Sequence, residues 1–196
     1  MRIKKPNKRI LILCEGFTEE LYAKSLKSEL PRNLQRSITI DINRNPKNDP
    51  KSLAEEARKR KRTARRERNS YDSIWLFFDN DNKTNELEAA FRIIDSEKFC
   101  MAYSSMCIEH WFILHIENCG RSFQDGSEAL RFLKVKWPEY HKTKLKHYEI
   151  LKDKLDTAID RAKRLRRNVQ TDLPKHQRNP YFTIDKLIDF FDEFKK

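Results

Sequence analysis

The sequence has no long apolar run and no closely spaced pair of cysteines. Within its 196 residues, no hydrophobic stretch approaches the roughly 18 residues that a membrane-spanning helix needs. The basic N-terminus is followed by an apolar stretch that ends at Cys14 and meets an acid, which is not the pattern of a signal peptide. The four cysteines show no C-x-x-C spacing. We therefore expect a reduced, cytoplasmic protein with no membrane partner.

The cysteine and histidine spacing also argues against zinc. His110 and His115 are five residues apart, so they align poorly on one face of a helix. Structural zinc sites usually show closer ligand spacing than any pair in this chain. The sequence has no internal repeat, and no low-complexity segment stands out beyond one Arg/Lys-rich stretch.

Positive charge is what the chain has in excess. It carries 42 Lys and Arg against 30 Asp and Glu, a formal net charge of +12. That balance favours a polyanionic partner, with nucleic acid (DNA or RNA) first and an anionic membrane surface second. Hydrophobic residues still make up 38% of the chain, including 12 Phe and 3 Trp, which is enough for a buried core.

The positive charge is concentrated in two segments. Between Arg58 and Arg68, eight of eleven residues are Lys or Arg, and like charges four apart destabilise a helix unless a partner neutralises them. Phosphate is the natural partner, and a plain solvated helix face is the alternative. The residues predicted to contact a nucleic-acid backbone are Arg58, Lys59, Arg60, Lys61, Arg62, Arg65, Arg66, Arg161, Lys163 and Arg164.

Four short apolar segments predict buried strands, over residues 9–14, 37–43, 73–78 and 99–103. Helices are expected over residues 18–30, 51–68, 86–98, 109–117, 127–137, 143–167 and 184–195. Thr18 is a candidate N-cap of the first helix, and Pro31 should end it. The alternation predicts an α/β fold with a mostly parallel four-stranded sheet over residues 1–120, and a helical C-terminal extension over residues 121–196 packed on it.

Acidic residues follow two of these strands. Glu15 comes directly after residues 9–14, and Asp79 and Asp81 follow residues 73–78. In a parallel sheet, sites form outside the carboxyl ends of the strands, so these side chains should meet. Crowded carboxylates repel one another unless a cation neutralises them, and oxygen ligands suit Mg²⁺ or Mn²⁺. We therefore expect Glu15, Asp79 and Asp81 to bind the metal.

Two further acids are candidates for the same site. Glu19 should lie in the first turn of the first helix, where the helix dipole favours an acid, and it could bind a second metal or orient a water. Glu109 could approach from the end of the fourth strand. For both residues the alternative interpretation is an ordinary acid at a helix N-terminus.

Several short segments, taken together and in order, resemble one protein family. They are Cys14-Glu15-Gly16-x-Thr18-Glu19, Trp75 to Asp81, Ser104, Glu109-x-Trp111-x-x-x-His115, Tyr140-x-Lys142, Ala158-Ile159-x-Arg161-Ala162-Lys163 and Asn179-Pro180-x-x-Thr183. The pattern is similar to the RloB family, which includes abortive-infection proteins of the AbiL type, and its acids are similar to the signature of the Toprim fold. One segment departs: the family usually carries Ser-Asn-Pro-x-Phe-Glu where this chain has residues 104–109.

The resemblance implies a Toprim-like (Rossmann-like) domain that uses Mg²⁺ or Mn²⁺ to cut DNA or RNA, in some relatives tRNA, in bacterial anti-phage defence. It implies a protein that acts alone or with an AAA/ABC-type ATPase partner, and it adds Lys142 as a group that stabilises the reacting phosphate. A non-catalytic nucleic-acid-binding subunit and a primase-like nucleotidyl transferase are the alternatives. The chain has no zinc-binding module to favour a primase, and formation of a homo-oligomer stays open.

Overall fold

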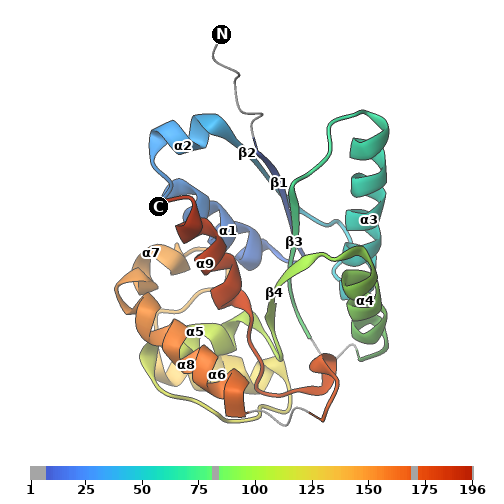
Figure 1. The fold of residues 1–196 in the computed structure, drawn as a ribbon. Coiled ribbons are helices and arrows are strands. Elements are labelled where there is room, and N and C mark those ends of the chain that lie inside the picture. Colours follow the sequence, from blue (N-terminus) through green and yellow to red (C-terminus); the bar gives the residue numbers. More distant parts are fainter. Residues whose placement is uncertain (1–7, 81–83, 169–171, 196) are drawn as a thin grey trace.

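Figure 1 shows a computed structural model of the protein, which describes residues 8–80, 84–168 and 172–195. Within those residues, four strands form one parallel sheet in the order β2-β1-β3-β4. The strands are β1 (Lys8–Cys14), β2 (Ile38–Arg44), β3 (Ser73–Asp79) and β4 (Cys100–Ser104). Each lies within one residue of its predicted range, so the predicted α/β fold with a four-stranded parallel sheet is confirmed.

Helices cover both faces of the sheet unequally (Figure 1). One face carries α3 (Pro50–Arg66) and α4 (Thr84–Glu97). On the other side lie α1 (Phe17–Ser28), α5 (Ile108–Ile116), α6 (Gly126–Lys136), α7 (His147–Leu151), α8 (Leu155–Asn168) and α9 (Ile184–Glu193). Among the residues described, none of the helices is both long and apolar enough to span a bilayer.

Alternation along β1 divides the core into two parts. Ile10 and Ile12 point into the larger cluster, whereas Leu11 and Leu13 point into the cluster under α3 and α4. This is the two-residue period of a strand that is buried on both faces. All four side chains are at most 1% exposed, so β1 is covered on both faces and a site beside this strand can form only at its end.

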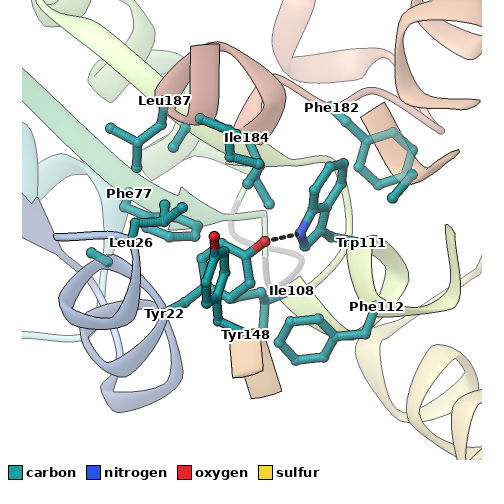
Figure 2. Packing of buried hydrophobic residues seen from close by; sticks show 14 of the residues in the cluster. Tyr22, Leu26, Phe77, Ile108, Trp111, Phe112, Tyr148, Phe182, Ile184 and Leu187 are labelled. Carbon is teal, nitrogen blue, oxygen red and sulfur yellow. Dashed lines mark hydrogen bonds between the residues drawn. The ribbon is translucent and has the colours of Figure 1, made fainter. Parts of the chain in front are cut away.

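The larger cluster joins the two ends of the chain (Figure 2). Trp111 of α5 donates a hydrogen bond from Nε1 to the Tyr22 hydroxyl of α1, at 3.1 Å, which satisfies two polar atoms that would otherwise be buried unpaired. Phe182 and Leu187, from the last part of the chain, pack into the same cluster. The helical C-terminal segment therefore shares its core with the sheet.

Two local predictions were wrong, and one short helix was not predicted. The first helix begins at Phe17 with Gly16 as its cap, and Thr18 lies in the first turn, where its hydroxyl donates to the Lys142 carbonyl at 3.3 Å. A short helix, α2 (Arg32–Ser37), follows Pro31; it has no buried residue, so hydrophobic periodicity could not reveal it. The helix expected over 143–167 is two helices, α7 and α8, joined by a 3₁₀ turn.

The split between α7 and α8 has a simple explanation. Their buried residues, from Tyr148 and Leu151 to Ala158 and Ala162, continue a single apolar stripe across the 3₁₀ turn. The stripe is what sequence periodicity detects, and it does not register a local tightening of the backbone from α to 3₁₀ hydrogen bonding.

The free edge of β4 is covered by the C-terminal segment that precedes α9. Ser104 forms an antiparallel bridge with Phe182, and the Thr183 N–H donates to the Tyr103 carbonyl at 2.8 Å. The Thr183 hydroxyl donates to the Met101 carbonyl at 2.9 Å. This cover satisfies backbone groups on an edge strand that would otherwise be open to pairing with another chain.

Candidate active site

A cleft of about 780 Å³ lies at the carboxyl ends of β1 and β3. Five of the predicted site residues line it, together with the start of α1, the loop after β2 and the start of α6. The complete set of lining residues is Glu15, Gly16, Phe17, Glu19, Arg44, Asn45, Pro46, Asn48, Asp79, Cys107, Glu109, Asp125, Gly126, Ser127, Leu130 and Lys142. This is the edge at which parallel sheets place their ligands.

Glu15 and Asp79 lie side by side because β1 and β3 are neighbours in the sheet. The Glu15 N–H donates to the Phe77 carbonyl at 2.9 Å, which extends the pairing of the strands one residue past β1. The Asp79 N–H points at Glu15 Oε2, at 3.4 Å. Two acids that are far apart in the sequence are thus held at the floor of one cleft.

Glu19 reaches the same cleft from the first turn of α1. Its side chain folds back over Gly16: a Cβ placed on that glycine would lie 2.5 Å from Glu19 Oε2. The backbone of Gly16 is extended, so the glycine is needed here for space and not for an unusual conformation. The Glu-Gly pair of the sequence motif therefore makes room for the second acid.

Glu109 enters the cleft from the start of α5 and has two partners from a distant loop. The Tyr140 hydroxyl donates to Glu109 Oε1 at 2.8 Å, and Lys142 Nζ lies 3.9 Å from the same oxygen. Glu109 is buried, whereas the side chain of Lys142 is 65% exposed. The bond from Thr18 to the Lys142 carbonyl ties this loop to α1, so one connection links both halves of the site.

The cleft raises the pKa of two of its ionisable groups, the carboxyl of Glu19 and the amine of Lys142. Burial, together with the nearby carboxylates of Glu109 and Glu15, raises the pKa of Glu19 to about 7. Burial opposes the charge on Lys142, but the carboxylates of Glu109 and Glu19 outweigh it and raise the pKa of this amine. The site therefore combines acids that repel one another with a lysine that stays cationic.

The chemistry of these donors fits a hard divalent cation. Mg²⁺ is commonly held by one or two carboxylates and completes its shell with water and phosphate oxygens, so Glu15 and Asp79 are sufficient protein ligands. Asp81, the third predicted ligand, lies outside the described residues. Within the residues that are described, no three His, Cys, Asp or Glu side chains form a compact ligand set. A cation here would therefore keep open positions for a substrate.

The two histidines that could suggest zinc are core residues. His110 is packed between the rings of Phe123 and Phe182, and His115 packs against Trp111. Burial lowers the pKa of each imidazole to about 4, so both are neutral at physiological pH. Neither lines the cleft.

The basic part of α3 lies away from the cleft. Because α3 runs back from the carboxyl end of the sheet toward its amino end, its charged C-terminal half is at the far end of the molecule (Figure 1). Arg60 pairs with Glu56, and Lys61 pairs with Glu97. Arg58, Lys59, Arg62, Arg65 and Arg66 make no ion pair with the described part of the chain, and all but the half-buried Arg58 are exposed.

The second basic cluster, on α8, lies on the other side of the sheet and is mostly engaged within the protein (Figure 1). Arg161 donates to the Leu114 carbonyl near the end of α5, at 2.7 Å, and Lys163 pairs with Asp189. Arg166 forms a two-pronged pair with Asp185, at 2.7 Å for each bond. Arg164 is exposed. The two predicted clusters therefore do not form one surface.

Sequence reasoning missed three contributors to the cleft. Tyr140 belongs to the Tyr-x-Lys motif, but its contact with Glu109 spans 31 positions of the chain. Phe17 and Arg44 meet at the mouth of the cleft, with the guanidinium 5.6 Å from the ring centroid. The start of α6 adds Gly126 and Ser127. No sequence pattern around these residues indicates a role in the cleft, because the residues that they contact there are distant in the sequence and are brought close only by folding.

Comparison with known proteins now adds one result. A family model described as RloB-like protein matches residues 10–191, which includes every described residue of the cleft. A search of curated proteins found no match.

Proposed function

The chain belongs to the RloB-like protein family, and from the cleft it builds we propose that it is a metal-dependent nuclease that hydrolyses phosphodiester bonds in DNA or RNA. One observation carries this proposal. Four carboxylates, those of Glu15, Glu19, Asp79 and Glu109, line a single cleft at the carboxyl edge of the sheet. Buried acids that repel one another lower the stability of a fold, which argues that they are kept for chemistry.

The reaction defines what the cleft must supply. A water loses a proton and attacks phosphorus, a new P–O bond forms, and the P–O bond to the leaving oxygen breaks as that oxygen gains a proton. A divalent cation bound at such a site lowers the pKa of a coordinated water and neutralises charge on the phosphate oxygens. Carboxylates alone would repel the substrate, so a cation is part of the proposal.

Each residue of the cleft has a role in this scheme. Glu15 and Asp79 would hold Mg²⁺ or Mn²⁺, with Asp81 as a third ligand. Glu19 would accept a hydrogen bond from the attacking water. Lys142, which is exposed and stays cationic, would stabilise the negative charge that develops on the phosphate.

Glu109 and Tyr140 complete the scheme as a supporting pair. The hydroxyl of Tyr140 donates to Glu109 Oε1, and Lys142 Nζ lies 3.9 Å from the same oxygen. We assign Glu109 the role of holding Lys142 near the phosphate, with Tyr140 as a positioning residue that fixes the carboxylate.

The test is cleavage by the purified protein of supercoiled DNA, single-stranded DNA and total bacterial tRNA, with Mg²⁺, with Mn²⁺ and with EDTA. Glu15→Gln and Asp79→Asn keep the size of each side chain and remove its charge. We expect cutting that needs the metal and is lost in both variants, and the substrate that is cut identifies the nucleic acid.

A matched control makes the result specific. Asp95→Asn changes an exposed acid of α4 that pairs with Lys175, outside the cleft, and should cut like the wild type. Equal loss in all three variants, or cutting that persists in EDTA, would contradict the proposal. Salt-sensitive binding without any cutting would favour a non-catalytic binding subunit instead.

The biological setting forms a second part of the proposal and rests on the family resemblance. We propose that the protein acts in bacterial anti-phage defence in the cytoplasm, with an AAA/ABC-type ATPase as its partner. Co-purification of the tagged protein with an ATPase of its host tests this part independently of cleavage, and recovery of the protein alone would argue against it.

A further inference from the structure

One large aromatic side chain is exposed beside the acidic cleft. Phe17 is 38% exposed and belongs to neither hydrophobic cluster, although it is the first residue of α1 and that helix buries Tyr22, Ala23 and Leu26. Among the described residues that are large, apolar and exposed, it is the only aromatic one. The fold gains little from the Phe17 ring, which lies at the mouth of the cleft next to Gly16.

An arginine faces this ring. Arg44 is the last residue of β2, and its guanidinium lies 5.6 Å from the centroid of Phe17. Its Nε is 4.0 Å from the Glu20 carboxylate, which orients the side chain, and half of the Arg44 side chain remains exposed. A flat cation over an aromatic face forms a surface on which another flat ring can stack.

Resting on the nuclease function proposed above, we infer that Phe17 and Arg44 form a stacking platform for one unpaired nucleobase of the substrate. The ring is one residue from Gly16 and two from Glu15, at the place where a phosphate would meet the metal ligands. A base is joined to its phosphate through a single sugar, so a nucleotide bound in the cleft brings its base to this rim.

The platform also selects a class of substrate. In a duplex, both faces of each base are occupied by its neighbours, so an aromatic side chain can stack only on a base that is unpaired or flipped out. Stacking on Phe, Tyr or Arg is tolerant of sequence because every base has a flat face. The preferred substrate is therefore a single strand, a loop or an end, with little dependence on sequence.

Binding measurements in EDTA test this inference without any cutting. Three fluorescent probes of equal length are used: an oligothymidylate, a strand of abasic sugar-phosphates, and a blunt duplex. For Phe17→Ala we expect about 5- to 100-fold weaker binding of the oligothymidylate, the range that base stacking supports. Binding of the abasic strand and of the duplex should stay within about twofold, since neither offers a free base.

Further variants separate aromatic stacking from other effects. Phe17→Trp should keep affinity, and Phe17→Leu should lose it although leucine is apolar. Arg44→Lys keeps the charge but loses the flat guanidinium and should fall between them. Ile150→Ala removes another exposed apolar side chain, on α7, and should change nothing. Chemical denaturation of each variant confirms that the fold is intact.

Several outcomes would overturn the inference. Equal weakening on all three probes would show that Phe17 only shapes the cleft. No weakening on the oligothymidylate, or a wild-type protein that binds the duplex better than the single strand, would show that the ring does not meet a base. If the expected pattern appears but Mg²⁺ supports no cleavage, the nuclease proposal fails and the stacking platform stands, so the two are distinguishable.

Discussion

The acidic cleft and the basic half of α3 lie at opposite ends of the same sheet and are built in opposite ways. The cleft draws Glu15, Asp79 and Glu109 from separate elements and buries or half-buries them. The basic half of α3 draws its charges from one continuous helix and leaves most of them in solvent. The position of a buried charge depends on the whole fold, whereas the position of a charge on an exposed helix depends on the local sequence alone.

The two regions should therefore respond differently to mutation. A change in the cleft should alter chemistry or stability strongly and depend little on salt, because buried groups are weakly screened. A change on α3 should have small effects that salt removes. Four changes test this contrast.

The largest effect is expected for Asp79→Asn in the cleft. Loss of one charged ligand at the reacting phosphate should slow metal-dependent cleavage by about 1,000-fold, or about 4 kcal/mol of activation free energy. Affinity measured in EDTA should not fall, because without the metal the charge of Asp79 only repels the substrate. Single-turnover cleavage and equilibrium binding check the two parts, and a loss of affinity equal to the loss of rate would mean that Asp79 acts in binding.

A half-buried arginine that pairs with a buried acid should behave like the cleft and unlike α3. Arg166 forms its two bonds to Asp185, which is fully buried, so Arg166→Ala leaves that acid without its partner. We expect a loss of about 3 kcal/mol in the free energy of unfolding, measured by urea denaturation. Arg164→Ala, an exposed neighbour on α8, should cost less than about 0.5 kcal/mol. Similar losses for both would remove the distinction.

Glu19→Gln should stabilise the protein at neutral pH. The pKa of Glu19 is raised from 4.5 to about 7, so its contribution to stability is present below pH 4.5 and is lost as the pH rises through 7. Removing the charge should increase the free energy of unfolding at pH 7.5 by about 2 kcal/mol, and the gain should vanish near pH 4.

Denaturation in EDTA at both pH values measures this gain. Glu20→Gln is the matched control, because Glu20 pairs with Lys24 and should show no gain. A gain for Glu19→Gln that does not depend on pH would mean that its origin is packing and not charge.

The smallest effect is expected on α3. Replacing both Arg62 and Arg65 by glutamine should weaken nucleic-acid binding about tenfold at low salt and reduce the slope of log affinity against log salt by about 2 if both contact phosphate. The rate of cleavage at saturating substrate should not change. Arg92→Gln on α4, which removes an ion-paired arginine, serves as the control. An unchanged salt slope would mean that this end of the helix does not contact the substrate.

The strands and the main site acids could be predicted from sequence because their signals are local. An apolar run of strand length followed by an acid marks both a buried strand and a residue at its carboxyl end, and Glu15 and Asp79 were found in this way. Asp81 remains a prediction, since it lies outside the described residues. The contact between Tyr140 and Glu109 could not be predicted, because no residue pattern near Tyr140 indicates that the two side chains meet in the fold.

The sequence gives the number of charged residues but not their surroundings in the fold. The sequence shows that Arg161 and Arg164 are basic, but only the fold shows that one donates to a backbone carbonyl and the other faces solvent. In the same way, periodicity located the apolar stripe of α7 and α8 but not the turn between them. Orientation and backbone detail are properties of packing, which a pattern of residue types does not specify.

The segment that covers β4 has a consequence for how the protein is made. Phe182 and Thr183 reach the sheet edge only after all four strands and α1 to α8 have been synthesised. The loop that carries Lys142 is held against α1 by a residue from the first turn of that helix. While the ribosome still holds residues 182 and 183, the edge of β4 is open and the larger core cluster lacks Phe182. A nascent chain therefore exposes the β4 edge, a site for pairing with other chains, until this cover has left the ribosome.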